Sequence, residues 1–355
     1  MRAMLLSAGK GRRLYPLTHL RAKAALPVLN IPLIQYALHY LRGFSIGDVV
    51  INLHHLPHSI KEAVSKGGME VHYSWEEELM GTAGGLKKAE EFLSGDDSLV
   101  INSDILTDYD LRELISFHQQ HKALATMVLC PNRNPARFTP IEVSPEGKIL
   151  RIGYQAEGES AGSNLPYMFT GIQMLSPEFF RFIPQGCYFE LARDVYRPLL
   201  QQEVPLYGLI MESFWCELGT PREYLEANLL LLKGDAIARG LWSRVAPLGK
   251  TIPQLCGAPP PLLGEGVTLQ KNAQFEGGVV IGDGSVIGQN CRIKNSLLWE
   301  DCSVGEGSHL EVSIVTAGVK LPPESLVRNR IVVAQRRGID LQKGEPMGEN
   351  LAFPF

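Results

Sequence analysis

The stretch that decides the fold of the C-terminal third reads Ile281-Gly282-Asp283-Gly284-Ser285-Val286-Ile287-Gly288-Gln289-Asn290-Cys291-Arg292-Ile293. Isoleucine returns every six residues, and the same step continues toward the N-terminus at Phe275, Leu269 and Leu263. After one step of five, apolar residues follow at Leu298, Val304 and Leu310, so that residues 17 apart share a position in successive turns. This repeat predicts a parallel β-helix, in which three-sided coils place one apolar side chain per face in the interior.

A proline-rich stretch precedes the repeat and separates it from the rest of the chain. Between residues 246 and 262 the helical period is lost, and prolines stand at Pro247, Pro253, Pro259, Pro260 and Pro261. Such composition is typical of a linker. We therefore predict a first domain over residues 1–240, a linker over residues 241–262, and a repeat domain with a C-terminal tail over residues 263–355.

Strand-like apolar runs alternate with helical patterns through the first 230 residues, beginning with four of each up to residue 121. The runs lie at 4–6, 49–53, 71–73 and 98–102, and the helical patterns at 32–42, 58–65, 84–93 and 110–121. This alternation predicts an α/β fold with a Rossmann-like, mostly parallel sheet covered by helices. Ligands of such a sheet bind beyond the carboxyl ends of its strands.

The remainder of the first domain is richer in strands. Residues 140–143 and 149–152 flank a turn with Pro145 and Gly147, and this pattern predicts a hairpin. A helix is expected to begin after Thr220, which would cap it, with Pro221 at the first helical position, and to run to Lys233.

Composition excludes several functional classes. The chain has 355 residues, 34 basic and 38 acidic side chains, and a net charge of −4, so there is no general attraction to nucleic acid or to an anionic membrane. No apolar run approaches the roughly 20 residues that span a bilayer. The six cysteines are scattered without a CxxC pair, which favours reduced thiols. We expect a cytoplasmic protein.

A glycine loop follows the first strand and reads Ser7-Ala8-Gly9-Lys10-Gly11-Arg12-Arg13. Glycines allow backbone N–H groups to approach phosphate oxygens, and the basic side chains supply charge, so we expect a polyphosphate ligand. Two better-known phosphate loops do not match. A Rossmann fingerprint needs glycine where Leu14 stands, and a Walker loop needs Lys and Ser or Thr where Arg12 and Arg13 stand.

The glycine loop opens a series of blocks that resembles the signature of sugar-1-phosphate nucleotidyltransferases. The blocks are Gly9-x-Gly11-x-Arg13-Leu14-x-Pro16-Leu17-Thr18, Lys23 with Leu26-Pro27-Val28-x-Asn30-x-Pro32, Gly81-Thr82-Ala83-Gly84-Gly85, Val100-Ile101-Asn102-Ser103-Asp104, Phe169-Thr170-Gly171, and Gly219-Thr220-Pro221-x-x-Tyr224-Leu225-x-Ala227-Asn228. With the repeat domain behind them, they resemble the two-domain arrangement of mannose-1-phosphate guanylyltransferases. In that arrangement the repeat is a left-handed parallel β-helix.

The resemblance implies a reaction in which a sugar 1-phosphate attacks the α-phosphorus of a nucleoside triphosphate and expels pyrophosphate. It implies Arg13, Lys23 and Asp104 as catalytic residues. Asp104 would also bind Mg²⁺ together with a second carboxylate. At that second position this chain has Glu217, where the family has aspartate.

The nucleotide-binding residues implied by the blocks are Ser7, Ala8, Gly9, Lys10, Gly11, Gly81, Thr82 and Ala83. Glu76 offers an acceptor suited to the N–H donors of guanine, whereas a uracil reader would favour an amide. On the sugar side, the resemblance implies Asn164, Gly171 and Glu190. The Glu-Lys-Pro triplet of many relatives is missing, and no lysine follows Lys148 until Lys233.

These observations favour a GTP-dependent enzyme acting on mannose 1-phosphate or a related sugar. Two alternatives are a uridylyltransferase of the same family and a regulatory subunit that binds nucleotide sugars without turnover, since Arg12, Glu217 and the missing lysine depart from the family pattern. We expect the β-helix domain to mediate a homo-oligomer, because an open coil end can be buried against another subunit.

Overall fold

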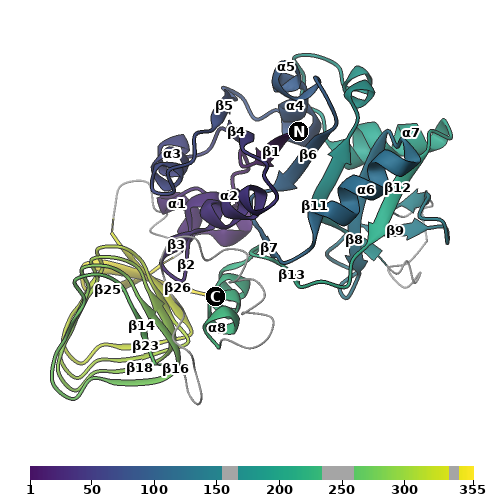
Figure 1. The fold of residues 1–355 in the computed structure, drawn as a ribbon. Helices are drawn as coiled ribbons and strands as arrows, with labels where there is room; N and C mark the ends of the chain where they lie inside the picture. Colours follow the sequence, from purple (N-terminus) through teal and green to yellow (C-terminus); the bar gives the residue numbers. More distant parts are fainter. Residues whose placement is uncertain (154–166, 234–259, 336–343) are drawn as a thin grey trace. The chain divides into compact units, whose positions relative to one another are not determined.

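The computed structural model describes residues 1–153, 167–233, 260–335 and 344–355 (Figure 1). These residues form two compact units. Unit 1 comprises residues 1–9 and 37–216, and unit 2 comprises residues 10–36 and 217–355. The glycine-loop segment from Lys10 to Tyr36 is therefore grouped with the C-terminal strands. The domain boundaries expected from the sequence, at residues 240 and 262, stay a prediction.

Unit 1 is built on a sheet whose first half is parallel. Strands β6, β1, β4 and β5 lie side by side in this order, and all three pairings are parallel. The central strands are buried on both faces, as expected when helices cover a parallel sheet. The bounds are β1 Arg2–Leu6, β4 Asp48–Leu53, β5 His72–Trp75 and β6 Ser98–Asn102.

The helices of this half match the predicted positions with one difference. The segment expected as a single helix over 84–93 is two helices, α4 and α5, with Ala89 between them. The bounds are α2 Leu33–Gly43, α3 Pro57–Ser65, α4 Gly81–Lys88, α5 Glu90–Leu93 and α6 Leu111–His121.

The second half of the sheet corrects the prediction of a mostly parallel arrangement. Strand β11 pairs antiparallel with β6, β8 and β9, and β9 and β10 form the predicted hairpin. The sheet is therefore mixed, because β11 runs opposite to all three of its neighbours. The bounds are β8 Ala125–Pro131, β9 Pro140–Val143, β10 Ile149–Ile152, β11 Tyr167–Leu175 and β12 Leu206–Ile210, which pairs parallel with β8.

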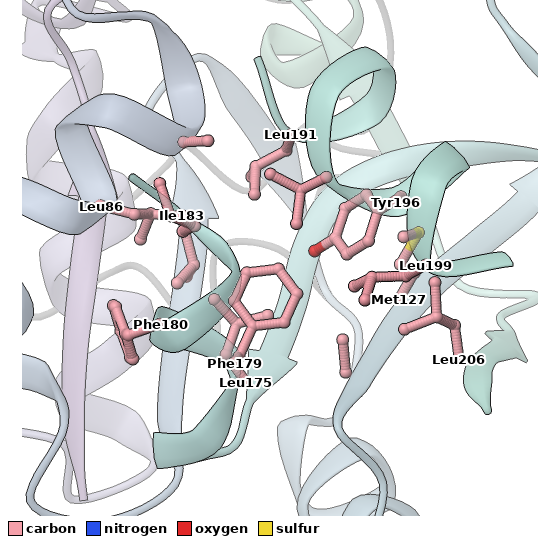
Figure 2. Close-up of a cluster of buried hydrophobic side chains, with 14 of the residues drawn as sticks. Leu86, Met127, Leu175, Phe179, Phe180, Ile183, Leu191, Tyr196, Leu199 and Leu206 are labelled. Carbon is pink, nitrogen blue, oxygen red and sulfur yellow. The ribbon is translucent and has the colours of Figure 1, made fainter. Parts of the chain in front are cut away.

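An apolar cluster joins the two halves of unit 1 (Figure 2). Leu86 of α4 packs in it with Phe179 of the 3₁₀ segment η3, and with Leu191 and Tyr196 of η4, a single turn of π-helix. Helix α7, Arg197–Gln201, adds Leu199. The cluster fixes α4, which begins at Gly81, against the chain that follows Glu190. The bounds are η3 Pro177–Phe182 and η4 Leu191–Tyr196.

The C-terminal part of unit 2 is a stack of short parallel strands. Ile281 lies beside Leu298, which lies beside Val315, and Ile287 lies beside Val304. The predicted 17-residue register is thus confirmed. The bounds are β14 Leu262–Leu263, β15 Thr268–Leu269, β16 Gln274–Ile281, β17 Val286–Ile287, β18 Arg292–Leu298, β19 Ser303–Val304, β20 His309–Glu311, β21 Ile314–Val315, β22 Lys320–Leu321, β23 Leu326–Arg328 and β24 Arg330–Ala334.

The stack has an apolar interior and a closing hairpin. Most of the expected inward residues are buried, whereas Leu263 and Leu269 of the first repeat stay partly exposed. At the other end, strand β26 pairs antiparallel with β24 and with β25. The sequence pattern did not predict this tail. The bounds are β25 Glu345–Met347 and β26 Asn350–Pro354.

The rest of unit 2 consists of the segment from Lys10 to Tyr36 and of helix α8, Pro221–Leu232. The side chain of Thr220 accepts a hydrogen bond from the Glu223 N–H, which confirms the predicted cap of α8. No helix among the described residues is both long and apolar enough to cross a membrane. The remaining bounds are η1 Arg12–Leu14, α1 Leu17–Leu20, η2 Lys23–Ala25, β2 Pro27–Val28, β3 Ile31–Pro32, β7 Ile105–Thr107 and β13 Trp215–Glu217.

Candidate active site

The turn at Gly11 requires glycine for two independent reasons. Its φ of +57° is in the left-handed region, and a Cβ placed on Gly11 would lie 2.7 Å from Cγ2 of Thr18. Thr18 also donates a hydrogen bond from its hydroxyl to the Gly11 carbonyl over 2.9 Å. The close approach of these two residues turns the chain sharply into η1, which carries Arg13.

Three of the predicted site residues meet within unit 2. The guanidinium of Arg13 lies 2.9 Å from Oε1 of Glu217, and the Lys23 ammonium lies 3.5 Å from the same oxygen. Glu217 and Lys23 are mostly buried, whereas the Arg13 side chain is 56% exposed. Two cations and one carboxylate leave a local charge of +1, which suits an anionic ligand that reaches the exposed guanidinium.

Two side chains of the last signature block, residues 219–228, form hydrogen bonds with the backbone that follows Lys23. The amide oxygen of Asn228, on α8, accepts a hydrogen bond from the Leu29 N–H over 2.8 Å, and its amide nitrogen donates to the Tyr224 carbonyl. The Tyr224 hydroxyl donates to the Pro27 carbonyl. The sequence pattern included both side chains in a block but assigned no role to either.

In unit 1, a buried polar network lies behind the first part of the glycine loop. The Ser7 N–H donates to Oδ1 of Asn52 over 2.6 Å, and Nδ2 of Asn52 donates to Oε1 of Glu76 over 2.7 Å. The other Glu76 oxygen accepts from the Met80 N–H over 3.0 Å, and the residue is only 1% exposed. A Cβ at Gly85 would lie 2.7 Å from this carboxylate.

This network changes the interpretation of two residues. Both carboxylate oxygens of Glu76 already accept hydrogen bonds from protein donors. That Glu76 binds the nucleotide base stays a prediction, and these hydrogen bonds do not favour it. Asn52 links the glycine loop to Glu76 and was missed at the sequence level. The available signal was a polar residue inside an otherwise apolar strand, where a buried amide requires partners.

Four other predicted residues form a second cluster in unit 1. The Thr82 hydroxyl donates to Oε2 of Glu190 over 2.8 Å and accepts from the Leu191 N–H over 2.9 Å. Gly81 has a φ of +72°, and a Cβ there would lie 2.5 Å from the Phe189 carbonyl, which accepts from the Ala83 N–H. The structure thus joins the predicted nucleotide block, residues 81–83, to the predicted sugar residue Glu190.

Asp104 and Gly171 lie at the carboxyl end of β6 and within β11, two neighbouring strands of unit 1. A Cβ at Gly171, whose φ is +88°, would lie 2.8 Å from Nδ2 of Asn102. Asp104 is partly buried. Asn164 lies outside the described residues. That Asp104 and Glu217 share one metal ion stays a prediction, and no group of three or more His, Cys, Asp or Glu side chains suited to a metal was found among the described residues.

These features define a class of protein: an α/β protein with a mixed sheet, in which Arg13, after a glycine turn, and Lys23, on η2, lie beside the carboxylate of Glu217. The family model described as nucleotidyl transferase matches residues 2–234, which is more than half of the chain. The chain therefore belongs to the nucleotidyl transferase family and is a transferase of that kind. A second model, described as the GMPPB C-terminal domain, matches residues 258–341.

Named relatives extend over most of the chain. It is 28% identical to UTP--glucose-1-phosphate uridylyltransferase of Synechocystis, covering 94% of this chain and 87% of the relative. It is 26% identical to mannose-1-phosphate guanylyltransferase of Mycobacterium tuberculosis, covering 87% and 82%. It is 29% identical to mannose-1-phosphate guanyltransferase of Saccharomyces cerevisiae, covering 66% of each chain.

Proposed function

We propose that this chain transfers a nucleotidyl group from a nucleoside triphosphate to a sugar 1-phosphate. An oxygen of the sugar phosphate bonds to the α-phosphorus, while the bond from that phosphorus to the bridging oxygen of the β-phosphate breaks. Pyrophosphate leaves with the electron pair. The observation that carries the proposal is the convergence of Arg13 and Lys23 on Glu217, together with the activities named for the relatives.

The two cations have different tasks in this proposal. The exposed guanidinium of Arg13 binds the β- and γ-phosphates and stabilises the pyrophosphate as charge develops on it, because a planar guanidinium can bind two phosphate oxygens at once. Lys23 is mostly buried, and it binds the α-phosphate region as a point charge. Glu217 holds both cations in place before the substrate arrives, which reduces the reorganisation needed in the transition state.

The proposal includes a magnesium ion, because Asp104 and Glu217 are of the residue type that binds it. Mg²⁺ is commonly held by one or two carboxylates plus substrate phosphates, and Asp104 and Glu217 supply two carboxylates. When bound, the ion would neutralise phosphate charge. Glu217 would contribute its carboxylate to the ion while its Oε1 accepts from Arg13 and Lys23.

The proposed substrates are GTP and mannose 1-phosphate or a related sugar. The mycobacterial and yeast relatives support this choice by their names. The cyanobacterial relative, a uridylyltransferase of glucose 1-phosphate, is the observation that favours UTP as the alternative. The sugar is assigned to the side of Thr82 and Glu190, whose hydrogen bond joins the two predicted binding blocks.

We further propose that the C-terminal stack is a left-handed parallel β-helix and that it mediates a homo-oligomer. Support comes from the constant register of its strands and from the partly exposed apolar residues of its first repeat, Leu263 and Leu269. Sedimentation of the whole chain should show a species larger than a monomer. A monomer across the micromolar range would contradict this assembly.

The experiment that tests the reaction is pyrophosphate release with each of the four NTPs and a panel of sugar 1-phosphates. We expect release with GTP and mannose 1-phosphate, and a loss of about 10²- to 10³-fold in turnover for Arg13→Gln and for Lys23→Gln. Arg12→Gln is the matched control, because Arg12 lies in the same turn and makes no ion pair with Glu217 among those observed. Binding of the NTP and the sugar phosphate without release of pyrophosphate in the presence of Mg²⁺ would instead support the alternative of a regulatory subunit without turnover.

Glu217 is tested separately through its dependence on magnesium. Glu217→Gln removes the charge but keeps the length of the side chain, so both turnover and affinity for Mg²⁺ should fall together. The measurement is the initial rate of pyrophosphate release across a magnesium titration. An unchanged rate with an unchanged magnesium midpoint would remove Glu217 from the site.

A further inference from the structure

The segment from Lys10 to Tyr36 carries both proposed cations, and its contacts with the C-terminal strands lie within unit 2. The Asn30 amide donates to the Ile281 carbonyl on β16 over 2.9 Å. The ring of Tyr15 meets that of Phe353, on β26, edge to face at 5.7 Å. The glycine-loop segment is therefore attached to the strand stack at more than one place.

The contact next to Lys23 is the most specific of these attachments. Arg21, two residues before Lys23, places its guanidinium over the ring of Trp299 at 5.0 Å. The same guanidinium forms an ion pair with the neighbouring Glu300. Trp299 is buried, and both charged side chains are partly buried, so the stacking and the ion pair act in a partly desolvated setting.

Trp299 also connects Arg21 to the far side of the segment. Its indole N–H donates to the Tyr224 hydroxyl over 3.1 Å, and that hydroxyl donates to the Pro27 carbonyl. Residues on both sides of Lys23, at positions 21 and 27, are thus held through one tryptophan of the strand stack. None of these side chains is among the predicted nucleotide- or sugar-binding residues.

We propose that Arg21 is a positioning residue, which uses Trp299 and Glu300 of the strand stack to hold the segment that carries Arg13 and Lys23. On this view the C-terminal stack is a part of the catalytic apparatus and not only an assembly module. The inference rests on the proposed function for its effect on turnover. Its structural part, the restraint on residues 22–29, stands independently of any activity.

The kinetic test compares Arg21→Ala with a matched control, Arg222→Ala. Arg222 lies over the ring of Phe355 at 5.1 Å, so it makes the same type of contact in the same unit, but from α8. Because a displacement of about 1 Å can cost about 10²-fold in rate, Arg21→Ala should lower kcat by about 10- to 100-fold. The KM for the NTP should change less than about threefold, and Arg222→Ala should stay near the wild-type rate.

Two further variants separate positioning from general damage. Arg21→Lys keeps the charge over Trp299 and should recover part of the lost turnover. Trp299→Leu should reduce kcat at least as much as Arg21→Ala does, because it also removes the N–H donor to Tyr224. The double variant should cost less than the product of the two single losses, because both variants remove the stacking of Arg21 on Trp299. Equal losses in Arg21→Ala and Arg222→Ala, or fully multiplicative losses in the double variant, would overturn the proposal.

Hydrogen exchange followed by mass spectrometry distinguishes failure of this inference from failure of the proposed function. The amides of Ala25 and Leu26 donate to the carbonyls of Ala22 and Lys23, so their protection reports the order of this segment. Arg21→Ala should speed exchange in a peptide over residues 22–29 by about tenfold, and Arg222→Ala should not. If Arg21→Ala leaves the protection of residues 22–29 unchanged, the inference about Arg21 is wrong, even if the enzyme is active. If exchange becomes faster but the wild-type chain releases no pyrophosphate, the proposed function is wrong and the inference about Arg21 stands.

Discussion

The two apolar cores of this protein are assembled in different ways. In unit 1, the cluster around Phe179 draws on helices, strands and the π-turn from widely separated parts of the chain (Figure 2). In the strand stack of unit 2, a core residue lies between counterparts one coil before and one coil after it, as Leu298 lies between Ile281 and Val315, each 17 residues away. One core depends on long-range packing, and the other is repeated from one coil to the next.

This difference has consequences for stability. In a stacked repeat each coil contacts only its neighbours, so a defect loosens the structure locally. In a single cluster shared by many elements, a cavity weakens every element that borders it. The following predictions test that contrast, beginning with the largest expected effect.

The first prediction concerns the cluster of unit 1. Phe179→Ala removes a fully buried ring, and it should cost about 4 kcal/mol of stability because the surrounding side chains can fill the cavity only in part. Hydrogen exchange should rise together in β6, β8 and β11. Leu150→Ala is the control, since Leu150 is half exposed in the same unit. Faster exchange confined to η3 would show that unit 1 does not respond as one core.

The second prediction concerns the stack. Leu298→Ala should cost about 3 kcal/mol, and the faster exchange should be limited to β18, which carries Leu298, and to the adjacent strands β16 and β21. The matched control is Leu326→Ala, because Leu326 is 65% exposed in the same stack and should change stability by less than about 0.5 kcal/mol. Exchange that rises equally in β24 and β26 would contradict a local response.

The smallest expected effect concerns the cap of α8, the helix that carries Tyr224 and Asn228. Thr220→Ala removes the acceptor for the Glu223 N–H and should lower stability by about 1 kcal/mol. Thr220→Ser keeps the acceptor, so it should restore most of the loss. Chemical denaturation of the three proteins provides the measurement, and equal midpoints would show that the cap contributes nothing.

Much of the architecture could be predicted from the sequence where the signal is local. The 17-residue register, the hairpin over 140–152, strand β6 and the start of α8 all appear at the expected positions. Each of these features is predicted by a signal within a short stretch of sequence: a repeated spacing of apolar residues, a turn, an apolar run or a helix cap. The mixed sheet was not predicted, because strand direction depends on pairing between β11 and β6, which lie about 70 residues apart.

The candidate site likewise contains residues that the sequence identified and residues whose role only the structure revealed. The motif residues Arg13, Lys23 and Glu217 were named from the sequence, and the structure joins them. The role of Glu76 in reading a base was also inferred from the sequence, whereas the structure occupies both of its oxygens with Asn52 and Met80. Asn52 itself carried only a weak signal, since one polar residue in a strand indicates neither its partner nor its purpose.

By itself the sequence determined that apolar side chains return every six residues, that a glycine turn is followed by basic side chains, and that the blocks stand in the order of a known family. Only the tertiary structure decided that a carboxylate 204 residues from Arg13 accepts from it, and that Trp299 lies under Arg21. The physical reason is that periodicity and turn geometry act between near neighbours in the chain. Ion pairs and stacking depend on distances in space, which the whole fold must first establish.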